Sequence, residues 1–150
     1  MLRRIKRALI IAVVGVLAVA VFVFSRPVKP VEQQVMEADR LEFIGEDFPS
    51  DGGSRAFFFH MPGKQYLMLL VVHRGSVKDR GNPDFQEIRI HGYQRKLTNV
   101  VAGSALEEKL VALLRTATIN TNEGRHYSAR PKPERLTWII ERMEDRKSTW

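Results

Sequence analysis

The sequence predicts an α+β fold: one N-terminal transmembrane helix, then a small domain in which helices pack on a three- or four-stranded antiparallel sheet. Three observations lead to this prediction: an uncharged apolar run near the N-terminus, two strand-like segments joined by a tight turn, and two amphipathic segments in the last third of the chain. We divide the chain into a basic end over residues 1–7, a membrane helix over 8–25 and one domain over 26–150.

The apolar run covers residues 8–24, which carry no charged or polar side chain. A helix of this length spans about 25 Å, and neighbouring Leu2, Ile5 and Ser25 would extend it toward the hydrocarbon thickness of about 30 Å. A helix at the surface of a globular core would have polar residues on its outer side, and none is present here. The run therefore predicts a membrane helix or a signal peptide.

The charges beside this run predict its orientation. Four cations and no acid precede it: Arg3, Arg4, Lys6 and Arg7. The positive-inside rule then places the N-terminus in the cytoplasm and the domain outside, as in a single-pass signal anchor of the bacterial inner membrane with a periplasmic domain. The triplet 18–20 (Ala-Val-Ala) offers an alternative, cleavage after Ala20. Cleavage would leave an apolar start to the mature protein, so we favour retention.

A strip of small residues follows one face of the predicted membrane helix. Ala8, Ala12 and Gly15 recur at a helical spacing. Small residues let two helices approach closely, so this strip is a candidate surface for a homo-oligomer.

The strand signals begin with an apolar hairpin. Residues 56–61 and 66–73 flank Pro62-Gly63, a strong turn pair. The second of these strands is apolar on both faces, which predicts that it is covered on both sides. Residues 85–91 alternate between apolar and polar side chains, and residues 92–101 are expected to continue the sheet.

Helical patterns flank these strands. Residues 31–44 begin with a helical spacing and become strand-like near residue 41. Ser104 and Glu107 form a capping box before a stripe of leucines. A last helix is expected to begin near Pro133, with an apolar stripe of Leu136, Ile139, Ile140 and Met143.

Composition restricts the chemistry. The net charge is +7, and four of the basic residues precede the apolar run. The rest of the chain carries 20 basic and 17 acidic residues, and these charges are interspersed. Without a basic patch, a nucleic-acid partner is not expected. Cysteine is absent, and the four histidines are too far apart to form a metal motif. We identify no catalytic residue, metal site or cofactor, and enzyme activity is not indicated by any motif.

Two features suggest contact surfaces. Trp138 lies opposite the apolar stripe of the last helix, and tryptophan is enriched at binding hot spots. The alternative is that a neighbouring loop covers it. The second feature is the polar stretch 120–130, where the candidate contact residues are Arg125, His126, Tyr127 and Arg130.

The functional hypothesis follows from the predicted topology. We expect an envelope protein whose outer domain acts as a protein-interaction, assembly or sensor module in a membrane complex, with other envelope proteins as its partners. One alternative is a phage lysis protein of the holin type, with a signal-receiving periplasmic domain. Another is an exported soluble enzyme or inhibitor, produced by cleavage after Ala20.

Overall fold

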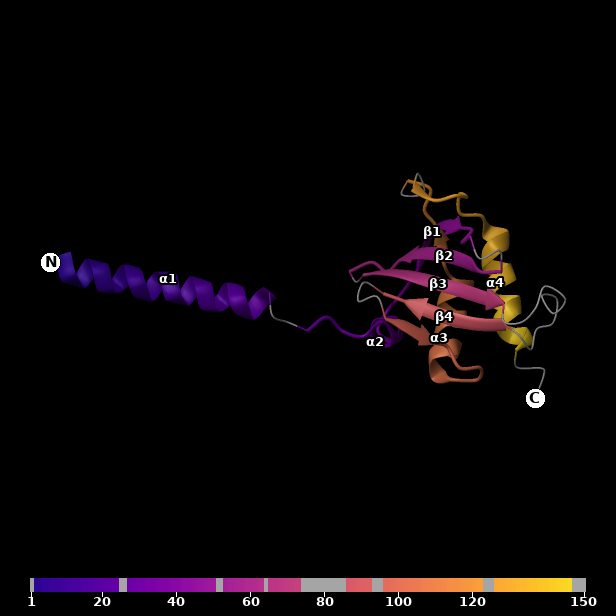
Figure 1. Cartoon of the computed structure of the whole chain (residues 1–150), viewed down its shortest axis with the longest axis horizontal. Helices are drawn as coiled ribbons and strands as arrows, with labels where there is room; N and C mark the ends of the chain where they lie inside the picture. The colour runs from indigo at the N-terminus through magenta and orange to yellow at the C-terminus, as the bar shows by residue number, and fades with distance from the viewer. Residues whose placement is uncertain are drawn as a thin grey trace.

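The computed structural model describes the backbone of residues 2–24, 27–50, 53–63, 65–73, 86–92, 96–122 and 126–146. Four helices and six strands are described there, in the order α1 (Leu2–Phe24), α2 (Val31–Met36), β1 (Glu42–Asp47), β2 (Arg55–His60), β3 (Tyr66–His73), β4 (Gln86–His91), β5 (Leu97–Asn99), α3 (Ala105–Arg115), β6 (Thr118–Ile119) and α4 (Pro133–Asp145) (Figure 1).

The six strands form one mixed sheet in the order β5-β4-β3-β2-β1-β6. All neighbours are antiparallel except β1 and β6, which pair in parallel. The fold is thus α+β, but the predicted sheet of three or four antiparallel strands is wrong. Two elements account for the difference: β1 is a complete strand, and the two-residue β6 joins its outer edge.

The hairpin is confirmed. Strands β2 and β3 pair from Arg55 with Val71 to His60 with Tyr66. The chain reverses at Pro62-Gly63, where Gly63 has a φ of 73°, a left-handed conformation that glycine adopts without a steric penalty.

Among the described elements, the helices that pack on the sheet, α2, α3 and α4, all lie on one face of it (Figure 1). The side chains of that face form the core with α2, α3 and α4: Phe43, Phe57, Phe59, Leu67, Leu69, Val71, Ile88 and Ile90 are all buried. The side chains that alternate with them on β2 and β3, among them Phe58, Met68 and Leu70, are half-buried. The prediction that β3 is covered on both sides is therefore wrong, and we call this second surface the open face.

The two amphipathic helices begin where the sequence predicts. The Ser104 hydroxyl accepts a hydrogen bond from the backbone N–H of Glu107 at 3.2 Å, and the Glu107 carboxylate accepts one from the N–H of Gly103 at 3.1 Å. The two side chains each satisfy a free backbone N–H, as predicted, but Glu107 reaches Gly103, one residue before the N-cap Ser104 whose N–H it would bind in a regular capping box. Helix α4 begins at Pro133, whose missing N–H costs nothing in a first turn.

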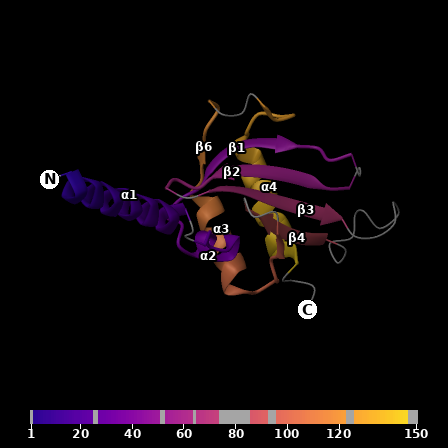
Figure 2. The ribbon, with the colours of Figure 1, turned by 60° about the vertical axis from the view of Figure 1, so that its left-hand side comes forward.

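Helix α1 lies apart from the sheet (Figure 1) and extends away from the α2 side of the domain (Figure 2), and its described apolar side chains are exposed. Over the part of the chain that the structure describes, no helix is both long and apolar enough to cross a membrane.

This finding contradicts the predicted transmembrane helix over residues 8–25. It also contradicts the location deduced from that helix, a single-pass inner-membrane protein with a periplasmic domain. The small-residue strip lies on an exposed face of α1, where a Cβ added to Gly15 would meet no atom within 4 Å. Self-association through Ala8, Ala12 and Gly15 stays a prediction.

Candidate functional site

Trp138 is held in place on α4 and remains partly accessible. Its indole packs against the ring of Phe57 on β2, with ring centroids 5.7 Å apart, and is half-buried. The guanidinium carbon of Arg142, one helical turn further on, lies 5.1 Å from the indole centroid. A cation placed over an indole face is attracted by the ring quadrupole. The indole therefore contacts both Phe57 and Arg142. A strand residue rather than a loop packs against it, and its role as a partner anchor stays a prediction.

A second arginine–aromatic pair lies at the end of the sheet where β1 ends and β2 begins. Phe48 is 45% exposed, and the guanidinium carbon of Arg55 lies 4.5 Å from its ring centroid. Arg55 and Phe57 are alternate residues of β2, so they share a face at a spacing of about 6.6 Å. Because Trp138 contacts Phe57, the two arginine–aromatic pairs are neighbours.

A third arginine ties the first turn of α4 to β1. The Nε of Arg135 lies 3.0 Å from Oε2 of Glu46, whose side chain is 2% exposed against 39% for the arginine. Glu46 stands opposite Phe57 in the β1–β2 register, which places Arg135 beside Trp138. The other oxygen of Glu46, Oε1, is buried and has no hydrogen-bond partner among the described residues.

These residues make up what we call the arginine–aromatic surface: Phe48, Arg55, Arg135, Trp138 and Arg142. On α4 its members recur at i, i+3 and i+7, which is one side of a helix. Figure 1 shows α4 crossing behind the end of the sheet where β1 and β3 end and β2 begins. Within the described chain, neither Arg55 nor Arg142 has a carboxylate at ion-pair distance.

Comparison with known proteins adds no candidate activity. The chain matches no known family model, no curated protein and no solved structure.

The predicted contact residues of the 120–130 stretch lie elsewhere. Tyr127 stacks on Phe58 of the open face, with centroids 4.6 Å apart, and its ring covers Gly45. The backbone N–H and hydroxyl of Ser128 donate to Asp47 at 2.7 and 2.8 Å, which fastens this stretch to the edge of β1. Tyr127 is thus a packing residue.

The stretch and Trp138 do not form one site. His126 and Arg130 are exposed, and Arg125 lies outside the described residues. Tyr127 lies over the open face, whereas Trp138 packs on the helix-covered face through Phe57. The structure thus separates the two features that the sequence proposed as contact surfaces.

A polar cluster surrounds Glu42 on the open face. Its Oε2 accepts from Nδ2 of Asn120 at 3.2 Å and lies 3.3 Å from Nδ1 of His60, and its Oε1 lies 3.8 Å from Arg40. The hydrogen bond from Asn120, followed by that from His60, lowers the pKa of Glu42 below its ordinary value of 4.5. Among the described residues no three potential metal ligands gather. The cluster joins β1, β2 and the segment after β6.

Replacing Asn120 by alanine should raise the pKa of Glu42 toward 4.5, because the largest cause of its lowering is removed. The ionised Glu42 stabilises the fold above pH 4.5, and this contribution disappears as the pH falls through the lower pKa of the folded state. A carbon-detected NMR titration of the Glu42 carboxyl group measures the shift. Asn99→Ala, on the distant β5, is the matched control and should leave that pKa unchanged. Equal titration curves for both variants would contradict the assignment.

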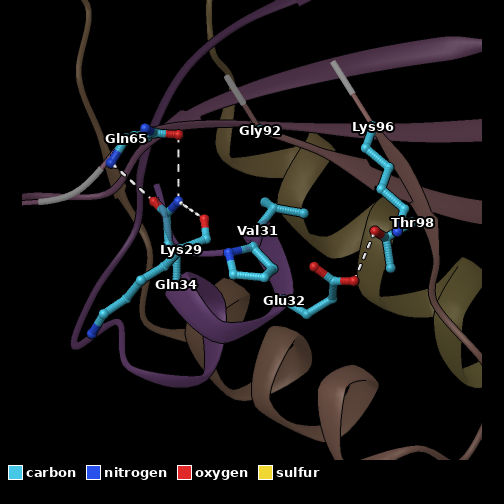
Figure 3. Close-up of a pocket in the computed structure, with 9 residues that line it drawn as sticks. Lys29, Val31, Glu32, Gln34, Gln65, Gly92, Lys96 and Thr98 are labelled. Carbon is cyan, nitrogen blue, oxygen red and sulfur yellow. Dashed lines mark hydrogen bonds between the residues drawn. The ribbon is translucent and has the colours of Figure 1, made fainter. Parts of the chain in front are cut away.

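A pocket of about 160 Å³ lies between α2 and the ends of β4 and β5 (Figure 3). The amide of Gln34 points across it, donating to the carbonyl oxygen of Lys29 at 2.7 Å and to Oε1 of Gln65 at 3.3 Å. On the other side Thr98 donates to Glu32 at 3.0 Å.

These groups pair mainly with one another. A Cβ added to Gly92 would lie 3.1 Å from the side chain of Val31, so α2 already sits against β4 as closely as the backbone permits. The pocket is also smaller than most ligand sites, which measure about 300–1,000 Å³. Its hydrogen bonds therefore fasten α2 to the sheet.

Sequence reasoning identified Trp138 and missed the four other members of the arginine–aromatic surface. A local signal existed for Arg142, because a residue four positions after a helical tryptophan lies on the same side of the helix. Phe48, Arg55 and Arg135 come together only through the β1–β2 register and the packing of α4.

Proposed function

We propose that the domain formed by residues 31–146 is a protein-interaction domain that binds its partner through the arginine–aromatic surface. The observation that supports this most strongly is the state of Trp138, which is partly accessible and yet held between Phe57 and Arg142. Binding hot spots are enriched in tryptophan and arginine, and a side chain that is already ordered loses little entropy when a partner covers it.

The surroundings of Trp138 support the same proposal. An exposed aromatic ring, Phe48, and two further arginines lie around it. Aromatic side chains offer a large contact area, and arginine combines a flat apolar face with several N–H donors. The proposal concerns the folded domain and makes no use of α1.

Site-specific cross-linking tests the proposal in the cells that produce the protein. A photoreactive amino acid replaces Thr137, which is exposed and next to Trp138, and in a control chain it replaces Leu97 on β5. We expect a cross-linked protein from position 137 and not from 97, and its loss in the Arg142→Ala chain. The Arg142 side chain lies over the indole and outside the core, so this variant should fold.

Two results would contradict the proposal. One is the same cross-linked band from both positions, because the contact would then not depend on the surface. The other is a band from position 137 that Trp138→Ala and Arg142→Ala both leave unchanged. Circular dichroism and urea unfolding of each variant separate a loss of binding from a loss of folding.

A further inference from the structure

We infer that the arginine–aromatic surface binds an acidic segment of a partner protein, in which carboxylates stand beside an apolar side chain. The inference rests on the proposed function and adds the chemistry of the partner. It starts from the three arginines of the surface, of which Arg135 forms an ion pair with the buried Glu46.

The arginines of this surface remain open to a further acceptor. Arg55 and Arg142 each lie over an aromatic ring, and within the described chain neither has a carboxylate at ion-pair distance. A ring occupies one flat face of a guanidinium, whereas the N–H donors lie around its edge. Two parallel N–H groups on such an edge match the two oxygens of a carboxylate.

Arg135 is fixed in position by a buried acid. Its Nε lies 3.0 Å from Glu46, so the two terminal nitrogens can meet another acceptor. Glu46 is itself buried and cannot reach a partner. It therefore acts as a positioning residue for Arg135.

Two exposed acids of α4, Glu134 and Glu141, lie four residues before and three residues after Trp138, on the same side of the helix. Among the described residues, neither forms an ion pair with Arg55, Arg135 or Arg142. The rings of Phe48 and Trp138, each beside a guanidinium group, can contact an apolar side chain. A segment with acidic and apolar residues in alternation fits this pattern of donors and rings.

Binding of defined peptides tests the inference. The probes are a ten-residue peptide of alternating glutamate and leucine, the same peptide with glutamine for glutamate, and the same with lysine. The readout is the fluorescence of Trp138 in the full chain carrying Trp150→Phe. We expect the glutamate peptide to bind at least about tenfold more tightly than the glutamine peptide, because each guanidinium gains a charged acceptor.

Charge variants with matched controls locate the binding site. Arg55→Gln with Arg142→Gln should weaken binding of the glutamate peptide at least about tenfold. Lys96→Gln with Lys109→Gln removes the same net charge from β5, α3 and their surroundings and should change the affinity less than about twofold. Equal weakening by the two pairs would overturn the inference, because the attraction would then come from net charge alone.

The remaining outcomes separate this inference from the proposed function. If the glutamate and glutamine peptides bind equally and Trp138→Ala abolishes the binding of both, the preference for an acidic segment is wrong, whereas the docking surface is supported. If no peptide binds and the cross-link at position 137 still forms, the partner class is again wrong. If neither peptide nor cross-link is observed, both proposals fail. Tighter binding of a ten-residue oligothymidine would overturn the inference in favour of a nucleic acid.

Discussion

Replacing Arg146 by methionine is expected to lower the free energy of unfolding by about 3–5 kcal/mol. Arg146 forms an ion pair with Glu107 on α3, and the side chains are 10% and 0% exposed, respectively. Its Nη1 also donates to the carbonyl oxygen of Val100 at 3.0 Å. Methionine keeps much of the volume, but the buried carboxylate would lose its ion pair with Arg146. Urea unfolding of the full chain measures the loss.

An exposed ion pair between the same two helices provides the control. Arg115 on α3 lies 2.5 Å from Glu144 on α4, with side chains 60% and 47% exposed. Arg115→Met should cost less than about 1 kcal/mol, because water screens this pair. Adding Glu107→Gln to Arg146→Met should recover part of the loss, since the amide keeps an acceptor for Gly103 without a buried charge. Equal losses in Arg146→Met and Arg115→Met would contradict the argument.

Glu107 illustrates how much of this fold the sequence predicts. Its role in the capping box depends on residues within four positions, and the sequence predicts it correctly. Its ion pair joins it to a residue 39 positions away. Local patterns of the same kind predict the β2–β3 hairpin and the start of α4 at Pro133. Long-range pairs have no such pattern, so they depend on the packed structure.

The errors in the sheet have the same origin. Strand β6 contains two residues, Thr118 and Ile119, and exists because β1 offers an edge for parallel pairing. Two residues are too few to show an alternation, so no sequence window predicts them. The apolar character of β3 predicted two covered faces. In the structure the helices cover one, while Tyr127 covers part of the other by stacking on Phe58.

Of the five residues of the arginine–aromatic surface, the sequence analysis named one, Trp138. The angular position of Trp138 on its helix is a local property, which the sequence contains. Its contact with Phe57 requires α4 to cross the end of the sheet, and the approach of Arg55 requires the β1–β2 register. The prediction of a transmembrane helix over residues 8–25 was drawn from composition, and among the described residues no helix is both long and apolar enough to cross a membrane.

Gly45→Ala is expected to lower the free energy of unfolding of the domain by about 1–3 kcal/mol, the largest effect after that of Arg146→Met. A Cβ at this position of β1 would lie 2.4 Å from Cδ2 of Tyr127, 2.5 Å from its Cγ and 2.7 Å from its Cβ. Atoms this close must separate, and those nearest to the tyrosine backbone cannot move by a simple rotation of the ring. The ring would therefore leave Phe58, on which it stacks at 4.6 Å.

A double-mutant cycle shows whether the steric contact is the cause. Tyr127→Ala removes the obstructing ring, so Gly45→Ala should cost less in that background, with a coupling energy of about 0.5–3 kcal/mol. Tyr127→Phe keeps the ring and should leave the cost of Gly45→Ala unchanged, which makes it the matched control. The unfolding free energies of all variants come from urea titrations. If Gly45→Ala cost the same with and without the ring, Tyr127 would not occupy the space above β1 in solution, and the packing of the open face would have to be assigned to other residues.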